Sequence, residues 1–198
     1  MINILIRAHD RPKYLENCVR SIEKQTYKDW NIIISVDNKH IEKYVKKLGY
    51  EYIRTDKVKY RFKKKETKVY WNLYFNTLQD MVKKGYVVYM DEDMEFFEET
   101  SLQKIIDNSH KDELLIFKYR VLPHGSRHER PTFKNFYKRP QRGTISTGCF
   151  SHHTDYKARW PAQRAGDYFA VSNLYGQLKT TWLNEVIING QKGSVNET

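Results

Sequence analysis

The run at residues 86–93, Tyr-Val-Val-Tyr-Met-Asp-Glu-Asp, constrains the fold more than any other segment. Five apolar or aromatic residues follow Gly85 without a charge, a pattern that predicts a strand buried on both faces. Ligands of open α/β sheets bind at the carboxyl ends of strands, where Asp91 and Asp93 would lie. Paired carboxylates there suit Mn²⁺ or Mg²⁺. The alternative is an acidic turn that caps the next helix.

The first half of the chain alternates strand and helix patterns. Apolar runs predict strands at 2–6, 31–36 and 50–53, and a fourth running into Asp91. A helix is expected from Pro12, with Leu15, Cys18, Val19 and Ile22 buried. A second is expected around 41–48, ending at Gly49. A third is expected from about 67 to 84, ending at Gly85. This alternation predicts an α/β fold with a parallel sheet and crossover helices.

The second half is less regular. We expect a short helix around 102–106, strands at 114–119, 144–150 and 180–188, and a helix at 166–178. Between them, 122–143 is polar, basic and interrupted by prolines. With no repeat and no linker, 1–190 is predicted to be one domain, followed by a short tail at 191–198.

The charge balance favours an anionic partner. Lys and Arg number 35 against 24 Asp and Glu, which gives a net charge of +11. Nucleotides, polyanionic glycans, nucleic acids and membrane surfaces all fit this charge. The two cysteines form neither a metal motif nor a disulfide framework. With no secretory leader and no apolar stretch of about 20 residues, we expect a cytoplasmic protein.

Three further acidic positions follow predicted strands or precede a predicted helix. Asp10 and Asp37 come after the first two strands, so they could meet Asp91 and Asp93 at one edge of a parallel sheet. Asp37 could accept hydrogen bonds from a base or ribose, or it could cap a helix. Asp167 follows a Gly-containing loop at the start of a helix, so it is either a cap or a general base.

Two basic stretches are candidates for anion binding. Residues 57–68 hold seven cations against Glu66 between a strand and a helix, where phosphates bind readily. We take Arg61 and Lys65 as its candidate phosphate ligands, although a solvated charge run is the usual alternative. The second stretch, 118–142, could be a lid, an acceptor-binding loop or a solvated hairpin.

The order of these motifs resembles a small GT-A-fold glycosyltransferase of family 2. The matching segments are Ile4-Leu5-Ile6-Arg7-Ala8-His9-Asp10-Arg11-Pro12, Gln25-Thr26-Tyr27, Ile32-Ile33-Ile34-Ser35-Val36-Asp37, Asp91-Glu92-Asp93, Gly148-Cys149-Phe150 and Asp167. The resemblance covers about 2–178. It departs from the family pattern at residues 7–10, after Asp37 and at Gly166, where the family often has Glu before the base.

The resemblance implies a mixed, mostly parallel GT-A sheet flanked by helices, with 1–93 binding a nucleotide sugar and 94–190 binding the acceptor. It implies inverting transfer of a sugar from a nucleoside-diphosphate sugar, with UDP as the expected nucleotide, to a hydroxyl of a glycan or lipid-linked acceptor. Asp91 and Asp93 would hold Mn²⁺ or Mg²⁺, and Asp167 would be the catalytic base, with Asp155 as the alternative. The donor would contact Arg7, His9, Asp37, Arg61, Lys65, Asp91 and Glu92.

Other classes of protein remain open on sequence alone. A metal-dependent nuclease would also gather carboxylates at strand ends and would suit the positive charge. A basic module that binds glycan or nucleic acid explains the charge but not Asp91-Glu92-Asp93. His152 and His153 could contact metal or acceptor, although such histidines are more often surface residues. We expect no nucleic-acid partner, and peripheral membrane contact through the basic loops is possible.

Overall fold

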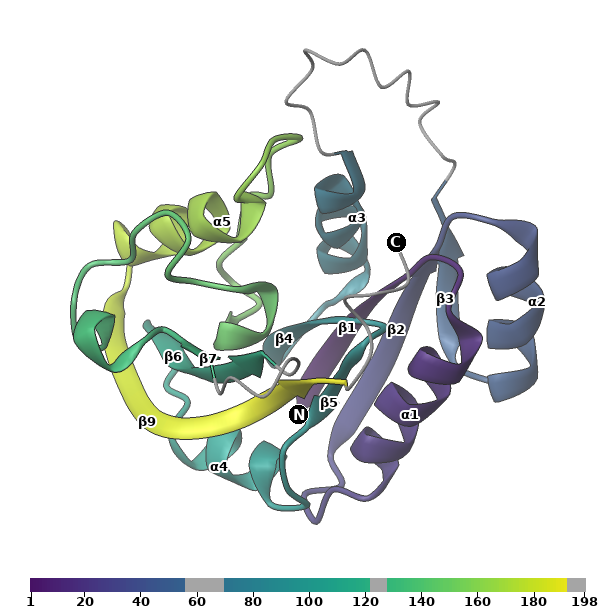
Figure 1. Cartoon of the computed structure of the whole chain (residues 1–198), viewed down its shortest axis with the longest axis horizontal. Helices are drawn as coiled ribbons and strands as arrows, with labels where there is room; N and C mark the ends of the chain where they lie inside the picture. The colour runs from purple at the N-terminus through teal and green to yellow at the C-terminus, as the bar shows by residue number, and fades with distance from the viewer. Residues whose placement is uncertain (56–69, 122–127, 192–198) are drawn as a thin grey trace.

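The computed structural model describes residues 1–55, 70–121 and 128–191, which form one mixed sheet flanked by helices (Figure 1). The strand order is β3-β2-β1-β4-β8-β6-β9-β5, and β7 pairs with β6. The strands are β1 (Ile2–Ala8), β2 (Trp30–Val36), β3 (Glu51–Arg54), β4 (Tyr86–Asp91), β5 (Met94–Phe96), β6 (Glu113–Val121), β7 (His128–Arg130), β8 (Phe150–His153) and β9 (Lys179–Gly190). The α-helices are α1 (Pro12–Glu23), α2 (Lys39–Leu48), α3 (Leu73–Met81), α4 (Ser101–Asp107) and α5 (Gly166–Tyr175), and the 3₁₀ turns are η1 (Tyr70–Asn72), η2 (Phe133–Asn135) and η3 (Thr147–Cys149).

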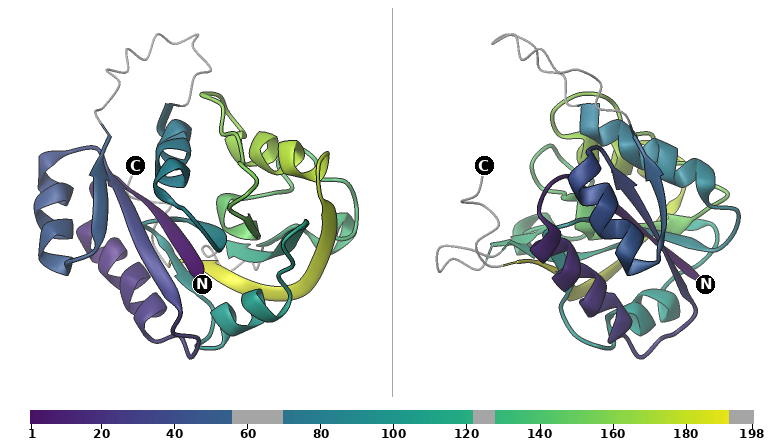
Figure 2. Two further views of the ribbon diagram at one scale, coloured as in Figure 1. Left: turned by 180° about the vertical axis from the view of Figure 1, so that it is seen from behind. Right: turned by 90° about the vertical axis from the view of Figure 1, so that its right-hand side faces the viewer.

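The predicted parallel arrangement of the first half is confirmed. β1 pairs in parallel with both β2 and β4, and β2 pairs in parallel with β3. Helices α1 and α3 lie on opposite sides of these strands (Figure 2). The register places Ala8 beside Val36 and Arg7 beside Asp91, so the carboxyl ends of the three central strands lie at one edge.

The buried Asn3 explains why a polar residue interrupts the first apolar strand. Its side-chain amide donates to the carbonyls of Lys84 (2.9 Å) and Tyr86 (3.2 Å). These groups belong to the segment that enters β4, so Asn3 joins β1 to the start of β4. A buried amide satisfied in this way helps to fix register rather than weakening the core.

The first two helices follow the sequence pattern. Helix α1 begins at Pro12 and buries the four residues expected from their spacing. Helix α2 ends at Gly49, whose φ of 77° is the left-handed conformation that glycine adopts at helix ends. The N-cap of α2 is Asn38, whose side chain accepts from the Ile41 N–H at 2.9 Å. The capping role considered for Asp37 therefore belongs to its neighbour.

The third helix is shorter than the sequence predicts. Helix α3 ends at Met81, because Val82 is already extended, and not at Gly85. Gly85 instead makes the turn into β4 with φ of 95°, and a Cβ there would lie 2.5 Å from the Met1 carbonyl oxygen. The glycine is thus required by close approach of two backbones.

The second half turns the sheet from parallel to mixed. β8 runs antiparallel to β4 and β6, whereas β9 runs parallel to β6 and antiparallel to β5. The strand predicted at 144–150 is wrong: η3 occupies 147–149, and β8 begins only at Phe150. Cys149 favours the turn, since its Sγ accepts from the Ser146 N–H and donates to the Arg130 carbonyl. The three-residue strands β5 and β7 carry too little pattern to be predicted.

The Gln-Thr-aromatic motif at 25–27 proves to be structural. Gln25 is buried, and its side chain donates to the carbonyls of Ser21 and Glu98 and accepts from the Leu102 N–H. The Thr26 N–H donates to the Glu99 carbonyl. The motif therefore ties the end of α1 to the start of α4.

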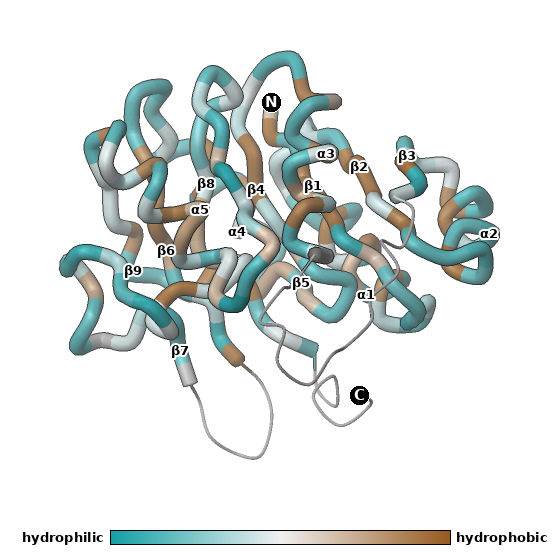
Figure 3. Tube along the Cα trace, turned by 90° about the horizontal axis from the view of Figure 1, so that it is seen from above, coloured by the Kyte–Doolittle hydropathy of each residue, from teal (hydrophilic) through white to brown (hydrophobic). Residues whose placement is uncertain are grey.

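Hydrophobic residues concentrate along the strands and the inner faces of the helices (Figure 3). β9 is long and curved, and it carries the sheet round to β5 (Figure 1). At its end Gln191 is buried, although it begins the expected tail; its amide donates to the carbonyls of Tyr14, Glu92 and Met94. Within the described ranges, no helix has the length and apolarity needed to cross a bilayer.

Candidate functional site

The carboxyl edge of β1, β2 and β4 gathers most of the residues proposed from sequence. Arg7 lies near the end of β1 and His9 just after it, Asp37 follows β2, and Asp91, Glu92 and Asp93 end and follow β4. Because β1 is the central strand of the three, residues from all of them meet around its end. Arg61 and Lys65 lie outside the described residues, as does the rest of the basic loop at 57–68.

Arg7 and Asp91 form the centre of the cluster. Arg7 Nε and Nη2 both approach Asp91 Oδ1, at 2.7 and 2.6 Å. Arg7 Nη1 donates to Asn72 Oδ1 at 3.2 Å, and the guanidinium lies 4.7 Å from the centre of the Phe75 ring. Both charged side chains are mostly shielded from solvent, so the pair is stronger than a surface ion pair.

Glu92 points into the protein and holds the loop after β1. Its Oε2 accepts from the His9 backbone N–H at 2.8 Å, and its Oε1 accepts from Arg11 Nε at 2.8 Å. The side chain is 2% exposed. Glu92 was expected to contact the nucleotide sugar, but both of its carboxylate oxygens are bound by the protein, which is the arrangement of a structural carboxylate.

Asp93 lies beside Asp91 and is paired with Arg11. Arg11 Nη1 donates to Asp93 Oδ2 at 3.0 Å. Burial raises the pKa of Asp93, and the negative charge of Asp91 raises it further, whereas Arg11 lowers it. Two neighbouring carboxylates in a poorly solvated place repel each other, and a cation between them would relieve that repulsion.

The donor chemistry of this pair fits a divalent metal. Among the described residues, Asp91 Oδ2 and Asp93 Oδ1 have no recorded hydrogen bond, which leaves one oxygen of each carboxylate for a cation. The described residues contain no cluster of three or more His, Cys, Asp or Glu that could hold a metal by itself. Mg²⁺ and Mn²⁺ commonly need only one or two carboxylates together with water and substrate phosphates.

The other side of the edge carries His9, Asp37 and Tyr74. His9 Nδ1 lies 2.8 Å from both carboxylate oxygens of Asp37. The side chain of Asp37 is 8% exposed and that of His9 is 58% exposed, so the imidazole stands over the carboxylate. Burial raises the pKa of the Tyr74 phenol, and Asp37 adds to that rise. These three polar groups lie together at the edge of the sheet, where a base or ribose could be bound.

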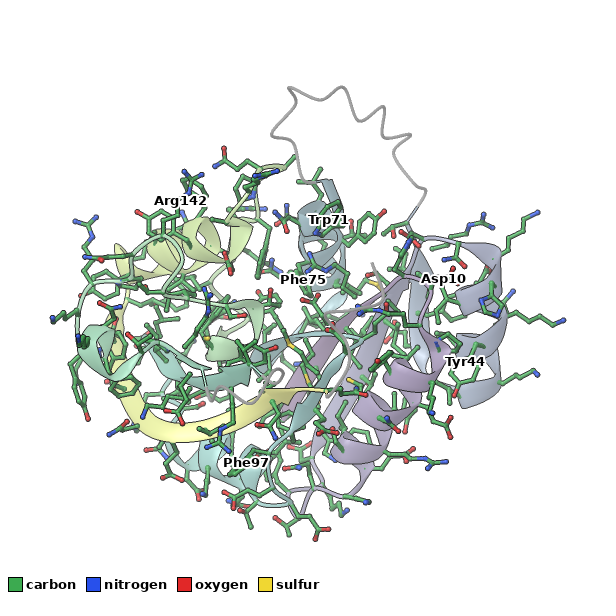
Figure 4. The ribbon with its side chains drawn as sticks, in the orientation of Figure 1. Asp10, Tyr44, Trp71, Phe75, Phe97 and Arg142 are labelled. Carbon is green, nitrogen blue, oxygen red and sulfur yellow. The ribbon has the colours of Figure 1, made fainter. Side chains whose placement is uncertain are left out.

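Asp10 does not join this cluster. Its carboxylate pairs with His40 Nδ1 at 2.9 Å, and both side chains are more than half exposed. It does not cap α1 either, since the N-cap is Arg11 and no side chain bonds there. Figure 4 shows Asp10 on the side of α1 and α2, away from Phe75, which underlies Arg7.

Asp167 lies in the first turn of α5, close enough to the cluster for Asp91 and Arg7 to influence its pKa. Burial raises its pKa, and the charge of Asp91 raises it further, while the Tyr168 N–H, Arg130 and Arg7 lower it. The Tyr168 N–H donates to Asp167 Oδ1 at 2.8 Å. A carboxylate with a raised pKa holds a proton more readily than an ordinary aspartate.

The alternative base and the two histidines lie elsewhere. Tyr86, at the start of β4, pairs with His153, so Asp155 lies at the end of the sheet opposite Asp91, where it pairs with Lys111 at 2.7 Å. His152 is buried, lies 2.8 Å from the Tyr89 hydroxyl, and has its pKa lowered to about 4 by burial. It is a core residue and not the surface residue or ligand considered from sequence.

Part of the second basic stretch lies near Asp167. Arg130 is close enough to Asp167 to lower its pKa, and Arg142 donates to the Arg164 carbonyl at 3.4 Å. Arg142 lies above α5 in Figure 4 and stacks on Phe169 at 5.8 Å. The part of this stretch at 122–127 lies outside the described residues.

Several residues of the site carried no recognised signal in the sequence. Asn72 and Gln191 hold the cluster through their side-chain amides, and Tyr74 lies beside Asp37. A polar stripe at 72, 76 and 79, on one face of a predicted helix, would have revealed Asn72. Gln191 gives no such signal, because its contacts join distant segments of the chain.

Comparisons with known proteins agree with this geometry. The family model described as glycosyl transferase family 2 matches residues 3–165, which ends just before α5. No curated protein sequence matches. Among solved structures, S. aureus TarS superposes with a TM-score of 0.69 at 15% identity, covering 96% of this chain and 36% of that one.

Structures of TarS 1–349 superpose in the same way. The complex with UDP-GlcNAc gives a TM-score of 0.68 at 15% identity, covering 96% of this chain and 58% of that one. The complex with UDP gives 0.67 at 15% identity, covering 96% and 60%. This chain therefore spans well under two thirds of these proteins, and at such identity the likeness shows the fold alone. Because the family model covers most of its length, the chain belongs to glycosyl transferase family 2 and has the GT-A fold of those enzymes.

Proposed function

We propose that this chain transfers a sugar, with inversion, from a nucleoside-diphosphate sugar to a hydroxyl of a glycan or lipid-linked acceptor. UDP is the proposed nucleotide, since the superposed TarS structures hold UDP-GlcNAc and UDP. The observation that carries the proposal is that Asp91, at the end of β4, and Asp93, just after it, lie close enough to the half-buried Asp167 for the charge of Asp91 to raise its pKa.

Asp167 is the proposed general base. Its carboxylate takes the proton of the acceptor hydroxyl as that oxygen bonds to the anomeric carbon of the sugar. The bond from the anomeric carbon to the diphosphate oxygen breaks on the opposite side, and the nucleoside diphosphate leaves with the electron pair. A single displacement of this kind inverts the anomeric centre.

Asp91 and Asp93 are the proposed metal ligands. Family 2 enzymes commonly use a divalent metal, and one oxygen of each of these carboxylates has no partner among the described residues. A bound Mn²⁺ or Mg²⁺ would neutralise the charge of the leaving diphosphate. Arg7 lies in the same cluster, so its guanidinium would add positive charge beside the phosphates.

His9, Asp37 and Tyr74 are the proposed contacts of the nucleoside. Asp37 accepts from His9 Nδ1, which orients the imidazole. The base and the ribose both carry N–H or O–H donors that a carboxylate can bind. Arg61 and Lys65 remain proposed phosphate ligands. The described basic residues, including Arg130 and Arg142, suit an anionic acceptor or a membrane surface that carries it.

Nucleotide binding tests the proposal most directly. UDP, GDP, CDP and ADP are titrated by calorimetry with and without Mn²⁺, on the wild type and on Asp93→Ala. We expect one diphosphate to bind in the presence of Mn²⁺ and its affinity to fall at least tenfold in Asp93→Ala. Asp155→Ala is the matched control, because Asp155 is an exposed aspartate at the other end of the sheet, and it should bind like the wild type.

If none of these diphosphates binds at millimolar concentration in the presence of Mn²⁺, the proposal is wrong. Binding that persists unchanged in Asp93→Ala would overturn the metal site alone. Asp167→Asn tests the base: it should bind the diphosphate normally but lose about 10²–10⁴-fold in kcat, the usual contribution of general base catalysis. Equal losses in Asp167→Asn and Asp155→Asn would remove Asp167 from that role.

A further inference from the structure

Three side-chain amides on one face of the third helix hold the segment that leads to the proposed base. Asn72, Asn76 and Gln79 are spaced four and three residues apart, so they share one face of η1 and α3. Asn72 Nδ2 donates to the carbonyls of Pro161 (3.2 Å) and Gln163 (2.8 Å).

Asn76 and Gln79 also bond to the backbone of this segment. Asn76 both donates to the Trp160 carbonyl (2.9 Å) and accepts from the Trp160 N–H (3.0 Å). Gln79 Nε2 donates to the Ala158 carbonyl at 2.7 Å. The backbone of 158–163 is therefore held along the helix at three points, and α5, which carries Asp167, begins at Gly166.

Asn72 differs from the other two amides because it also contacts the metal side of the site. Its Oδ1 accepts from Arg7 Nη1 at 3.2 Å, and Arg7 in turn holds Asp91. Asn72 is 6% exposed. The oxygen of this buried amide thus bonds to Arg7, which orients Asp91, and its nitrogen bonds to the segment that leads into α5 and Asp167.

The start of α5 is shaped around this amide. A Cβ built on Gly166 would lie 2.3 Å from Asn72 Nδ2 and 2.7 Å from Asn72 Cγ. Such distances are far below van der Waals contact, so a side chain at 166 and the amide at 72 exclude each other. The preceding Ala165 has φ of 59°, a left-handed conformation rare for alanine, which shows that the turn into α5 is tightly constrained.

We infer that Asn72 is a positioning residue that fixes the base Asp167 relative to Asp91, and that Gly166 is glycine because the Asn72 amide occupies its side-chain space. The inference rests on the proposed transferase function and deepens it. Asn72 touches neither donor nor acceptor in this role. It acts through Arg7 on one side and through the 161–163 backbone on the other.

The kinetic test compares Asn72→Ala with Asn76→Ala, in an assay of sugar transfer or of donor hydrolysis. A displacement of about 1 Å between reacting groups can reduce a rate 10²-fold, so we expect kcat to fall 10- to 100-fold in Asn72→Ala. The KM for the donor should change less than threefold. Asn76→Ala loses bonds to the same segment but none to Arg7, and its kcat should stay within threefold of the wild type.

Equal losses of kcat in the two variants would overturn the inference, because general loosening of 158–163 would then explain both. An unchanged kcat in Asn72→Ala would overturn it as well. If the wild type binds no nucleoside diphosphate, the proposed function is wrong. That measurement uses neither variant, so it is distinguished from a failure of the inference about Asn72.

A second test does not need activity. Thermal unfolding is measured for Gly166→Ala in the wild type and in Asn72→Ala. In the wild type the added methyl group meets the amide, and we expect Tm to fall by about 3 °C or more. In Asn72→Ala the space is open, so the same substitution should leave Tm unchanged or raise it. An equal fall in both backgrounds would contradict the packing of Asn72 against Gly166.

Discussion

Arg7 and Asp91 lie opposite each other in the register of β1 and β4, and the guanidinium of one binds the carboxylate of the other through Nε and Nη2. Neighbouring strands therefore supply an ion pair at the point where the sheet edge becomes a candidate site. The pair holds Asp91 in one orientation while Asp93 is held by a different arginine, Arg11. Two separate cations thus keep two adjacent carboxylates together in a poorly solvated place.

Arg7→Lys should weaken catalysis more than it weakens folding. Lysine keeps the charge but cannot at once bind Asp91, bind Asn72 and place a guanidinium over the Phe75 ring. We expect kcat/KM to fall about 10–100-fold. Steady-state kinetics measures this, with Arg20→Lys as control, since Arg20 makes an exposed pair with Glu16 on α1. Wild-type kinetics in Arg7→Lys would show that only the charge at position 7 matters.

His152 should make the protein less stable as the pH falls from 6.5 towards 4. Its pKa is lowered from 6.5 to about 4 because it is buried, so the unfolded chain binds a proton in this range and the folded protein does not. The difference between the two pKa values corresponds to about 3 kcal/mol of the free energy of unfolding. This contribution is fully lost below about pH 4. Urea unfolding across this range measures it.

His152→Gln provides the comparison, because glutamine can still bond to the Tyr89 hydroxyl but does not titrate. The variant should lack most of the pH dependence between 6.5 and 4. His153→Gln, which alters the neighbouring histidine, should retain it. Parallel curves for His152→Gln and the wild type would assign the pH dependence to other groups.

The sequence predicts the first half of the fold better than the second for a physical reason. Parallel strands buried on both faces form continuous apolar runs, such as Ile32–Ile34, and the helices between them have a clear apolar face. Around 144–150 the backbone is set by contacts from distant residues, such as Met94 Sδ packed 3.1 Å from where a Cβ of Gly148 would be. The local sequence pattern does not indicate such contacts.

The candidate site shows the same division. Asp91, Asp93 and Asp37 could be proposed from sequence because a carboxylate after a buried strand has a place defined by topology. Glu92 has the same local pattern, yet its carboxylate turns inward to the backbone of His9, which no pattern of alternation could reveal. Asn72 depends on contacts 65 and 91 residues away along the chain, with Arg7 and Gln163.

Gly85→Ala should destabilise the fold much more than Gly49→Ala. Both glycines have positive φ, 95° and 77°, but a Cβ at Gly49 would meet nothing within 4 Å. We expect about 1 kcal/mol for Gly49→Ala, the usual cost of a left-handed alanine. Gly85→Ala should cost at least about 2 kcal/mol more, because its Cβ would strike the Met1 carbonyl. Similar midpoints of urea unfolding for the two variants would mean that the start of β1 moves away freely.

Asp37→Asn and Asp10→Asn separate a nucleotide contact from an exposed ion pair. Both aspartates follow a parallel strand and contact a histidine, but Asp37 is nearly buried beside Tyr74, whereas Asp10 is exposed beside His40. A hydrogen bond to a charged group contributes about 1.5–3 kcal/mol, so we expect Asp37→Asn to weaken diphosphate binding about 10–100-fold. Asp10→Asn should stay within twofold. Calorimetric titration with the nucleotide and Mn²⁺ measures both, and equal affinities in the two variants would place the nucleoside away from Asp37. If Asp10→Asn weakens binding instead, the nucleoside would lie near the start of α2, where His40 contacts Asp10.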